Sequence, residues 1–149
     1  MNVLLDTNVF IDYIGRKPPF FQAAAQVVAA GYFGDAKLWV PAQSLKDAFY
    51  VLERYIDSAR IQQAFIKVCE VVQPVGLSGE DAIRAARLNW KDYEDCLVAV
   101  CADKVKADYL VTRDPKWFER SPVPVISPDK LLEELKAKFG TEYDAITTQ

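Results

Sequence analysis

The chain has 149 residues, of which 51% are hydrophobic and 26% charged, with a formal net charge of -3 and no histidine. This length and composition suit one globular domain and exclude a disordered chain, and the acidic balance argues against a protein that coats nucleic acid nonspecifically. Without histidine there is no Ser-His-Asp or Cys-His nucleophile system and no imidazole metal site, so catalysis would have to use carboxylates, Lys, Tyr, hydroxyls or a hard metal such as Mg²⁺ or Mn²⁺.

Strand and helix patterns alternate along the chain. Short apolar runs bounded by polar residues predict buried strands, and apolar residues at three-and-four spacing predict helices. In chain order the sequence predicts strand 3–5, a helix from Asn8, helix 20–30 opened by Pro18 and Pro19, strand 37–41, helices 45–56 and 61–68, strand 71–75, helices 80–88 and 93–105, strands 109–112 and 123–126, and helix 131–139. This alternation predicts an α/β fold with a parallel sheet and helices on both faces.

The predicted elements form one domain over residues 1–139, followed by a polar C-terminal tail at 140–149. No apolar stretch approaches the ~20 residues that a bilayer span needs, so we expect a cytoplasmic protein with no membrane contact. The cysteines are expected to be reduced thiols in the core, because their number is odd and their spacing fits neither a zinc site nor a disulfide framework: Cys69, Cys96 and Cys101.

Two predicted strands end in an acid. Asp6 follows the first strand and Asp114 follows the strand at 109–112. In an open parallel sheet, ligands bind beyond the carboxyl ends of the strands, so both acids are candidate site residues. Each also has a structural explanation, because Asp6 can cap the helix that starts at Asn8 and Asp114 with Pro115 can start a turn.

Two further acids lie near helix starts. Asp95 is in the first turn of helix 93–105, on the face of Ala99 and Ala102, which can approach the sheet closely. Asp92 is read first as the N-cap of this helix and second as a supporting contact to a metal or water.

Asp47 is the less certain fourth acid. It lies opposite the apolar stripe of helix 45–56, so a solvated aspartate is nearly as good an explanation as a functional one. Glu53 is the alternative, although it lies almost two turns further from the strand end. Four ionised carboxylates in one crevice would repel one another, and a cation would relieve most of that cost.

Four segments of this sequence, taken together, resemble the PIN domain, and in particular the small prokaryotic VapC-like toxins. They are LLDTNVFIDYI, SLKDAFYVL, DYEDCLVAVCADKVKADYLVTRD and VPVISPDKLLEEL, and the resemblance runs from Asn2 to about Phe139. It implies a three-layer α/β/α sandwich with a five-stranded parallel sheet, in which the strand of Asp6 lies beside the strand of Asp114. It also implies a metal-dependent ribonuclease that uses Mg²⁺ or Mn²⁺ on an RNA substrate, is held by a cognate antitoxin protein and assembles as a homodimer.

The resemblance also implies residue roles. Asp6, Asp47, Asp95 and Asp114 match the four acids of the family as catalytic residues and metal ligands. Asn8 and Thr112 match positions that can hold a carboxylate or a water, although a helix cap and a strand-end turn explain them about as well.

Two other functions are consistent with the sequence. One is a PIN-like module that binds RNA or protein without cleaving it. The other is a Mg²⁺-dependent phosphohydrolase of the haloacid dehalogenase kind, which is disfavoured because that chemistry needs a second aspartate where this chain has Asn8. Aromatic residues near the acids can stack RNA bases, although we expect most of them to be buried: Trp90, Tyr93, Trp117 and Phe118.

Overall fold

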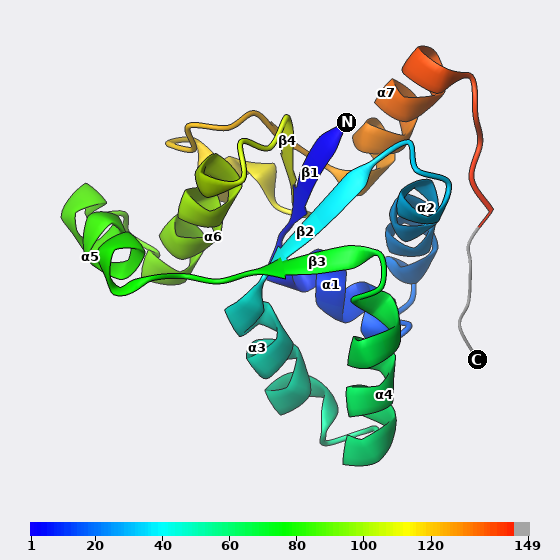
Figure 1. The fold of residues 1–149 in the computed structure, drawn as a ribbon, viewed down its shortest axis with the longest axis horizontal. Helices are drawn as coiled ribbons and strands as arrows, with labels where there is room; N and C mark the ends of the chain where they lie inside the picture. The colour runs from blue at the N-terminus through cyan, green and yellow to red at the C-terminus, as the bar shows by residue number, and fades with distance from the viewer. Residues whose placement is uncertain (145–149) are drawn as a thin grey trace.

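The computed structural model describes residues 1–144 and has one five-stranded sheet in the order β3-β2-β1-β4-β5. All neighbouring strands are parallel, which confirms the predicted α/β class (Figure 1). The strands are β1 (Asn2–Leu5), β2 (Lys37–Pro41), β3 (Val72–Val75), β4 (Tyr109–Val111) and β5 (Val125–Ile126). From β1 the chain first adds strands on one side, β2 and β3, and later on the other side, β4 and β5. The topological switch point therefore lies between β1 and β4, and a ligand crevice is expected there.

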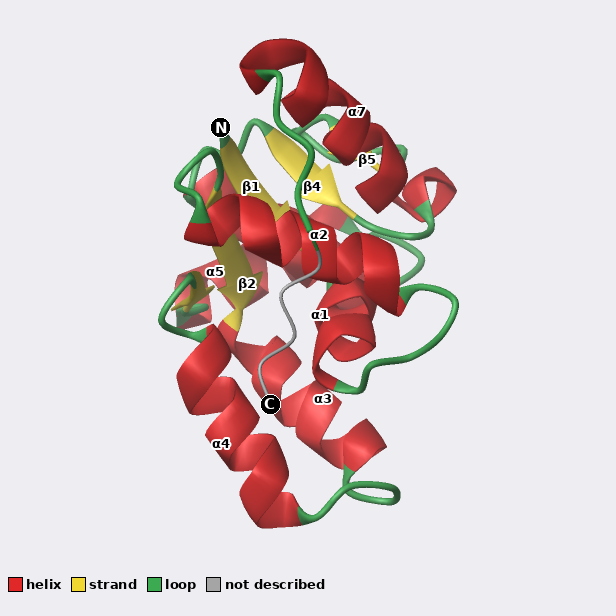
Figure 2. Ribbon diagram, turned by 90° about the vertical axis from the view of Figure 1, so that its right-hand side faces the viewer, coloured by secondary structure: helices red, strands yellow, loops and turns green. Residues whose placement is uncertain are grey.

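Helices cover both faces of this sheet, as the alternating pattern predicts. The helices are α1 (Thr7–Ile14), α2 (Phe21–Tyr32), α3 (Ala42–Leu52), α4 (Ser58–Val68), α5 (Gly79–Leu88), α6 (Tyr93–Lys104) and α7 (Pro128–Phe139), with a 3-10 helix η1 (Pro115–Phe118) after β4. Figure 1 shows α5 and α6 on one side of the sheet and α2 and α7 on the other. Figure 2 shows α3 and α4 as a pair that extends away from the sheet.

The central strand β1 contributes to the core on both faces. Val3 and Leu5 pack in the larger hydrophobic cluster with residues of α1, α2 and α7, whereas Leu4 packs in a second cluster with residues of α6. Successive side chains of a strand point to opposite faces, so one apolar run fills both layers. This explains why β1 has no polar residue before Asp6 other than Asn2 at its start.

Element ends differ from the prediction by a few residues. The helix predicted to reach residue 56 ends at Leu52, and a turn follows in which the backbone N–H groups of Tyr55 and Ile56 both donate to the Leu52 carbonyl. The last strand begins at Val125 rather than at residue 123. Both differences arise because apolar residues in adjacent turns are buried in the same core and so extend the sequence pattern beyond the regular element.

Part of the polar segment predicted as a tail packs on α2. Tyr143 is buried, its hydroxyl donates to Asp35 Oδ2 at 2.6 Å, and its carbonyl accepts a hydrogen bond from Gln26 Nε2 at 2.9 Å. Residues 145–149 of the predicted tail lie outside the described residues. Within residues 1–144, no helix is both long enough and apolar enough to cross a bilayer.

Candidate active site

Asp6 lies at the junction of β1 and α1. The residue is 6% exposed, and its Oδ1 accepts a hydrogen bond from the Thr7 backbone N–H at 2.8 Å. Asp6 is therefore the N-cap of α1, which is the structural role predicted for it. Its backbone N–H donates to the Val111 carbonyl at 2.8 Å, which fixes the end of β1 to the end of β4. The capping role leaves Oδ2 for other partners.

Thr112 connects Asp6 to Asp114. Its buried hydroxyl donates to Asp6 Oδ2 at 2.7 Å and accepts a hydrogen bond from the Asp114 backbone N–H at 3.2 Å. Asn8 completes the connection, because its Nδ2 donates to Asp114 Oδ2 and to Thr112 Oγ1, each at 3.4 Å. Residues 106 positions apart in the sequence therefore form one hydrogen-bonded group beside β1 and β4, where the strand order of the sheet reverses.

Asp95 approaches the same group from α6. It lies in the first turn of the helix, and its backbone N–H donates to Asp92 Oδ1 at 3.1 Å, which confirms the predicted N-cap role of Asp92. Ala99 and Ala102 are buried on the Asp95 side of this helix, and α6 contacts both β1 and β4. Small side chains here allow α6 to pack close to the two strands that carry the other acids.

The three acids interact through their charges. Burial raises the pKa of Asp6, and the nearby charge of Asp114 raises it further, while hydrogen bonds from Thr112 and Thr7 oppose the change. Burial raises the pKa of Asp95 to about 6, with further contributions from the charges of Asp92, Asp6, Glu94 and Asp114. The charges of Asp6 and Asp114 both act on Asp95, so the three carboxylates lie within electrostatic range of one another.

The donor set of this region suits a hard divalent cation. Carboxylate oxygens are the ligands that Mg²⁺ and Mn²⁺ prefer, and Asn8 Oδ1 is a buried acceptor with no hydrogen-bond partner, as expected beside a site that holds ordered water. Within residues 1–144, no three Asp, Glu, Cys or His side chains are close enough to enclose an ion by themselves. Mg²⁺ usually binds through one or two carboxylates, several waters and substrate phosphates, so the residues present fit it.

Asp47 is a partly exposed residue of α3. Its side chain is 35% exposed and forms an ion pair with Lys46 at 3.2 Å. One turn before it, however, the buried Ser44 hydroxyl lies 2.7 Å from Thr7 Oγ1, so this face of α3 adjoins the start of α1. The alternative residue Glu53 is exposed beyond the end of α3.

Sequence reasoning missed an ion pair beside the site. Asp12 on α1 is 1% exposed, and its Oδ2 lies 2.7 Å from Arg113 Nε. In the sequence, Arg113 lies between the site residues Thr112 and Asp114. The Arg113 guanidinium also lies 4.1 Å from the Phe20 ring centroid. An aspartate six positions after Asp6 in a helix gives no sequence signal of burial, because its partner is 101 residues away.

The four aromatic residues near the acids have different environments. Phe118 is buried and Trp90 is partly buried, with ring centroids 6.2 Å apart in an edge-to-face arrangement. Tyr93 and Trp117 are exposed. Phe118 is the one fully buried residue of the four, so the expectation that most of them are buried is wrong.

Sequence comparison identifies a related family. A family model described as PIN domain matches residues 2–116, which include all four predicted acids. The sequence has no match among curated proteins.

Three bacterial complexes are among the solved structures with the same fold. VapBC2 from Rickettsia felis, bound to a DNA fragment from its promoter, has a TM-score of 0.64 at 18% identity, and the match covers 85% of this chain and 98% of that chain. VapBC-1 from nontypeable Haemophilus influenzae has a TM-score of 0.64 at 15% identity, covering 87% and 99%. FitAcB from Neisseria gonorrhoeae has a TM-score of 0.63 at 15% identity, covering 85% and 97%. At these identities the likeness establishes the fold.

Proposed function

Because this chain belongs to the PIN domain family, whose members are generally nucleases, we propose that it is a ribonuclease that uses Mg²⁺ or Mn²⁺ to hydrolyse RNA phosphodiester bonds. We propose further that it is the toxin of a toxin–antitoxin pair. The supporting observation is the Thr112 hydroxyl that joins Asp6 and Asp114 beyond the carboxyl ends of β1 and β4, together with the charges of both acids that raise the pKa of Asp95. A divalent cation relieves that repulsion.

Each residue has a proposed role in this site. Asp6, Asp95 and Asp114 hold the cation, and Thr112 orients Asp6 through the hydrogen bond to Oδ2. Asn8 Oδ1 accepts a hydrogen bond from water in the site, because it has no partner within the protein. A bound divalent cation supplies charge neutralisation at the phosphate and a water of lowered pKa.

The attacking nucleophile is a water molecule that must be oriented, and either Asp95 or Asp47 can orient it. Asp47 remains the proposed second acid of the family pattern, at the edge of α3 that adjoins the start of α1.

The test is metal-dependent cleavage by matched variants. Wild type, Asp6→Asn, Asp47→Asn and Asp103→Asn are incubated with structured RNAs in Mg²⁺, Mn²⁺ or EDTA, and products are separated on a denaturing gel. Asp103 is the control, because it lies on α6 like Asp95 but is paired with Arg84 on the surface at 2.7 Å. We expect cleavage by wild type and Asp103→Asn with metal, a loss of at least a hundredfold in Asp6→Asn, and a loss in Asp47→Asn if this residue is the second acid.

Cleavage that persists in EDTA or in Asp6→Asn would identify a contaminating nuclease. Absence of cleavage by the wild type on every RNA, with tight RNA or protein binding retained, would instead support the noncatalytic PIN-like module.

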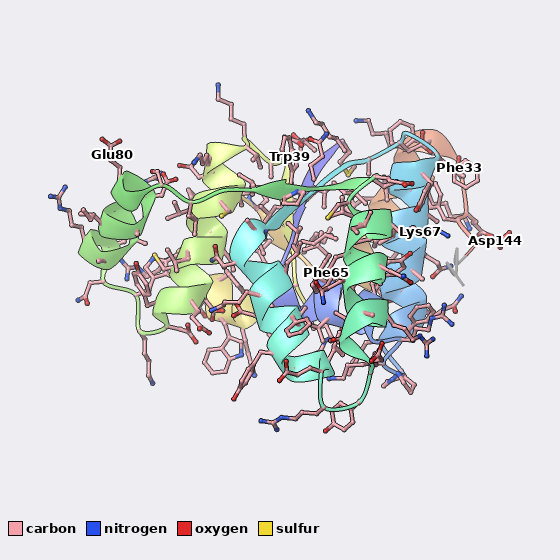
Figure 3. All side chains as sticks on the ribbon, turned by 60° about the horizontal axis from the view of Figure 1, so that its bottom comes forward. Phe33, Trp39, Phe65, Lys67, Glu80 and Asp144 are labelled. Carbon is pink, nitrogen blue, oxygen red and sulfur yellow. The ribbon has the colours of Figure 1, made fainter. Side chains whose placement is uncertain are left out.

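We propose an antitoxin and a homodimer as the protein partners. Solved structures that share this fold include the VapBC and FitAcB complexes. A groove of about 720 Å³ lies between the end of α1 and α4, and Lys67 extends from α4 toward α2 (Figure 3). Arg60 also lines this groove, and Asp57 is the acidic residue of the lining. We propose that an acidic segment of a partner binds beside Arg60 and Lys67.

The partner proposal is tested by co-expression with the protein encoded by the adjacent reading frame. We expect a complex that is weakened by Arg60→Glu together with Lys67→Glu and unaffected by the distant Lys37→Glu. Light scattering of the purified chain measures the homodimer, and a monomer at all concentrations would reject it.

A further inference from the structure

Asp114 lies beyond the part of the chain that the sheet holds in place. The sheet fixes the chain as far as Thr112, whose backbone N–H donates to the Ile126 carbonyl at 3.0 Å. Asp114 is exposed, and its side chain makes no capping hydrogen bond to the 3-10 helix η1 that follows. Its carboxylate accepts a hydrogen bond from Asn8 Nδ2 at 3.4 Å, which is long for an N–H donor. A candidate metal ligand in this position needs a further anchor to keep one geometry.

Arg113, between Thr112 and Asp114, connects this loop to α1. Its Nε lies 2.7 Å from Asp12 Oδ2, and its Nη2 donates to Asp12 Oδ1 at 3.5 Å. Its guanidinium also lies over the Phe20 ring at the start of α2, 4.1 Å from the ring centroid. A planar guanidinium that is held by a carboxylate and by the face of an aromatic ring keeps a fixed orientation. The loop that carries Asp114 is therefore anchored from the side of α1 and α2.

Stability alone does not account for this ion pair. Asp12 is 1% exposed, so its charge is removed from water, and the attraction to Arg113 offsets the cost of that transfer. Apolar side chains of similar volume often stabilise a core equally well or better, so an ion pair in such a place points to a role in geometry. The helix that Asp12 belongs to begins at Asp6, so the pair joins the helix of one candidate ligand to the loop of another.

We propose that Asp12 and Arg113 are positioning residues for the metal site, which hold the loop at residues 112–114 against α1 so that the Asp114 carboxylate stays beside Asp6. This inference rests on the proposed function and deepens it, because it assigns the preorganisation of the site to a pair that does not touch the cation. Side chains that orient metal ligands contribute to metal affinity in this way.

The charges of the pair make the direction of the effect informative. Removal of the Arg113 charge alone would favour a cation nearby, since like charges repel. A loss of cation affinity in Arg113→Gln therefore reports a change in geometry and not in charge. The double variant with Asp12→Asn and Arg113→Gln has the net charge of wild type, and it leaves no buried charge without its partner.

The first test is calorimetric titration of the RNA-free protein with Mn²⁺. We expect Arg113→Gln and the double variant to bind Mn²⁺ about ten- to 100-fold more weakly than wild type, because the loss of a residue that orients a ligand usually has an effect of this size. Urea denaturation should show that the double variant recovers most of the midpoint that Arg113→Gln loses. Weak Mn²⁺ binding in a variant of recovered stability is the result that a purely structural pair would not give.

Arg84 and Asp103 form the matched control pair. Their side chains are also 2.7 Å apart, and Asp103 lies on α6 like the candidate ligand Asp95, but both side chains are exposed. The double variant with Arg84→Gln and Asp103→Asn should bind Mn²⁺ as wild type does. Wild-type affinity in the Asp12, Arg113 double variant would overturn the proposal, and so would equal losses of affinity in the two double variants.

The second test measures the loop without metal. The Asp114 backbone N–H donates to Thr112 Oγ1 at 3.2 Å, whereas the Asp6 backbone N–H donates to the Val111 carbonyl at 2.8 Å. In EDTA, hydrogen exchange followed by NMR should be faster at Asp114 in the Asp12, Arg113 double variant than in wild type and unchanged at Asp6. Unchanged exchange at Asp114 would show that the loop does not depend on the pair, and would overturn the proposal.

The two tests also separate this inference from the nuclease assignment. Mn²⁺ binding that Asp6→Asn abolishes, with unchanged affinity in the Asp12, Arg113 double variant, would reject the positioning role and leave the metal site intact. Weaker Mn²⁺ binding and faster exchange in that double variant, without RNA cleavage by wild type, would support the positioning role and reject the nuclease. Absence of Mn²⁺ binding by wild type would reject both.

Discussion

At the scale of single residues, Asp12 is more deeply buried than the candidate ligand Asp6, with 1% against 6% exposure. Burial raises the pKa of Asp12 above its ordinary value, and the adjacent Arg113 charge opposes part of this rise. A charge in this position is tolerated because Arg113 Nε lies 2.7 Å away. The pair therefore fixes Arg113, and with it the neighbouring Thr112 and Asp114, against α1.

We expect Asp12→Asn to lower the free energy of unfolding by about 3 kcal/mol, because one half of a buried pair remains without its partner charge. The value lies at the low end of the usual range, since the Arg113 side chain is 29% exposed and keeps some access to water. Urea denaturation measures the change. Asp103→Asn breaks an exposed pair with Arg84 and should cost less than about 1 kcal/mol. Equal losses in the two variants would contradict the structural role.

The raised pKa of Asp95 predicts a pH-dependent stability in the metal-free protein. The pKa is about 6 in the folded state against an ordinary value of 3.8. Below about pH 4 the group is protonated in both states, and between pH 4 and 6 only the unfolded state releases the proton. The contribution of Asp95 to stability therefore falls as pH rises through this window and stays unfavourable above it.

We expect Asp95→Asn to raise the metal-free Tm at pH 7.5 and to leave it nearly unchanged at pH 4. Mg²⁺ or Mn²⁺ should raise the Tm of wild type at pH 7.5 more than that of the variant. Thermal unfolding followed by circular dichroism with and without EDTA measures both effects. A Tm difference of the same size at both pH values would mean that Asp95 has an ordinary pKa.

At the scale of elements, α6 carries Asp95 on a helix that is buried on most sides. Residues Val98 to Ala102 are all buried, and Ala99 and Ala102 adjoin the sheet. The sequence predicted this helix and its Asp92 cap because both signals are local. It could not predict that the Asp12 carboxylate pairs with Arg113, because that contact depends on the placement of α1 against the end of β4.

We expect Ala99→Leu to lower the free energy of unfolding by about 1 to 3 kcal/mol, because the larger side chain does not fit between α6 and the sheet. Ala86→Leu on the exposed side of α5 is the control and should change stability by less than about 0.5 kcal/mol. Calorimetric titration with Mn²⁺ should also find weaker binding in Ala99→Leu, since Asp95 moves with the helix. Unchanged stability would mean that α6 has room to shift.

At the scale of the whole molecule, the sequence predicts the parallel sheet but not the burial of Tyr143. The parallel sheet follows from the alternation of strands and helices, and the neighbouring positions of β1 and β4 agree with the PIN-domain resemblance. The packing of Tyr143 on α2 had no sequence signal, because the segment after Gly140 is polar and the contacts with Asp35 and Phe33 are over 100 residues distant.

We expect Tyr143→Ala to lower the free energy of unfolding by about 3 kcal/mol, through loss of the buried ring and its hydrogen bond. The substitution Tyr55→Ala removes an exposed ring of the same type and should have little effect. Chemical denaturation measures the free energy of unfolding of both variants. Equal free energies in Tyr143→Ala and Tyr55→Ala would mean that residues 140–144 do not unfold together with the rest of the domain.

The central position of β1 has a consequence for the order of events during synthesis on the ribosome. The first strand to emerge pairs on one side with β2 and on the other with β4, which ends more than 100 residues later. Long-range pairing of this kind delays folding until the late partner is available. Asp6 therefore cannot meet Asp114 until most of the polypeptide has been translated, so a nascent chain carries no assembled carboxylate cluster while it is still short.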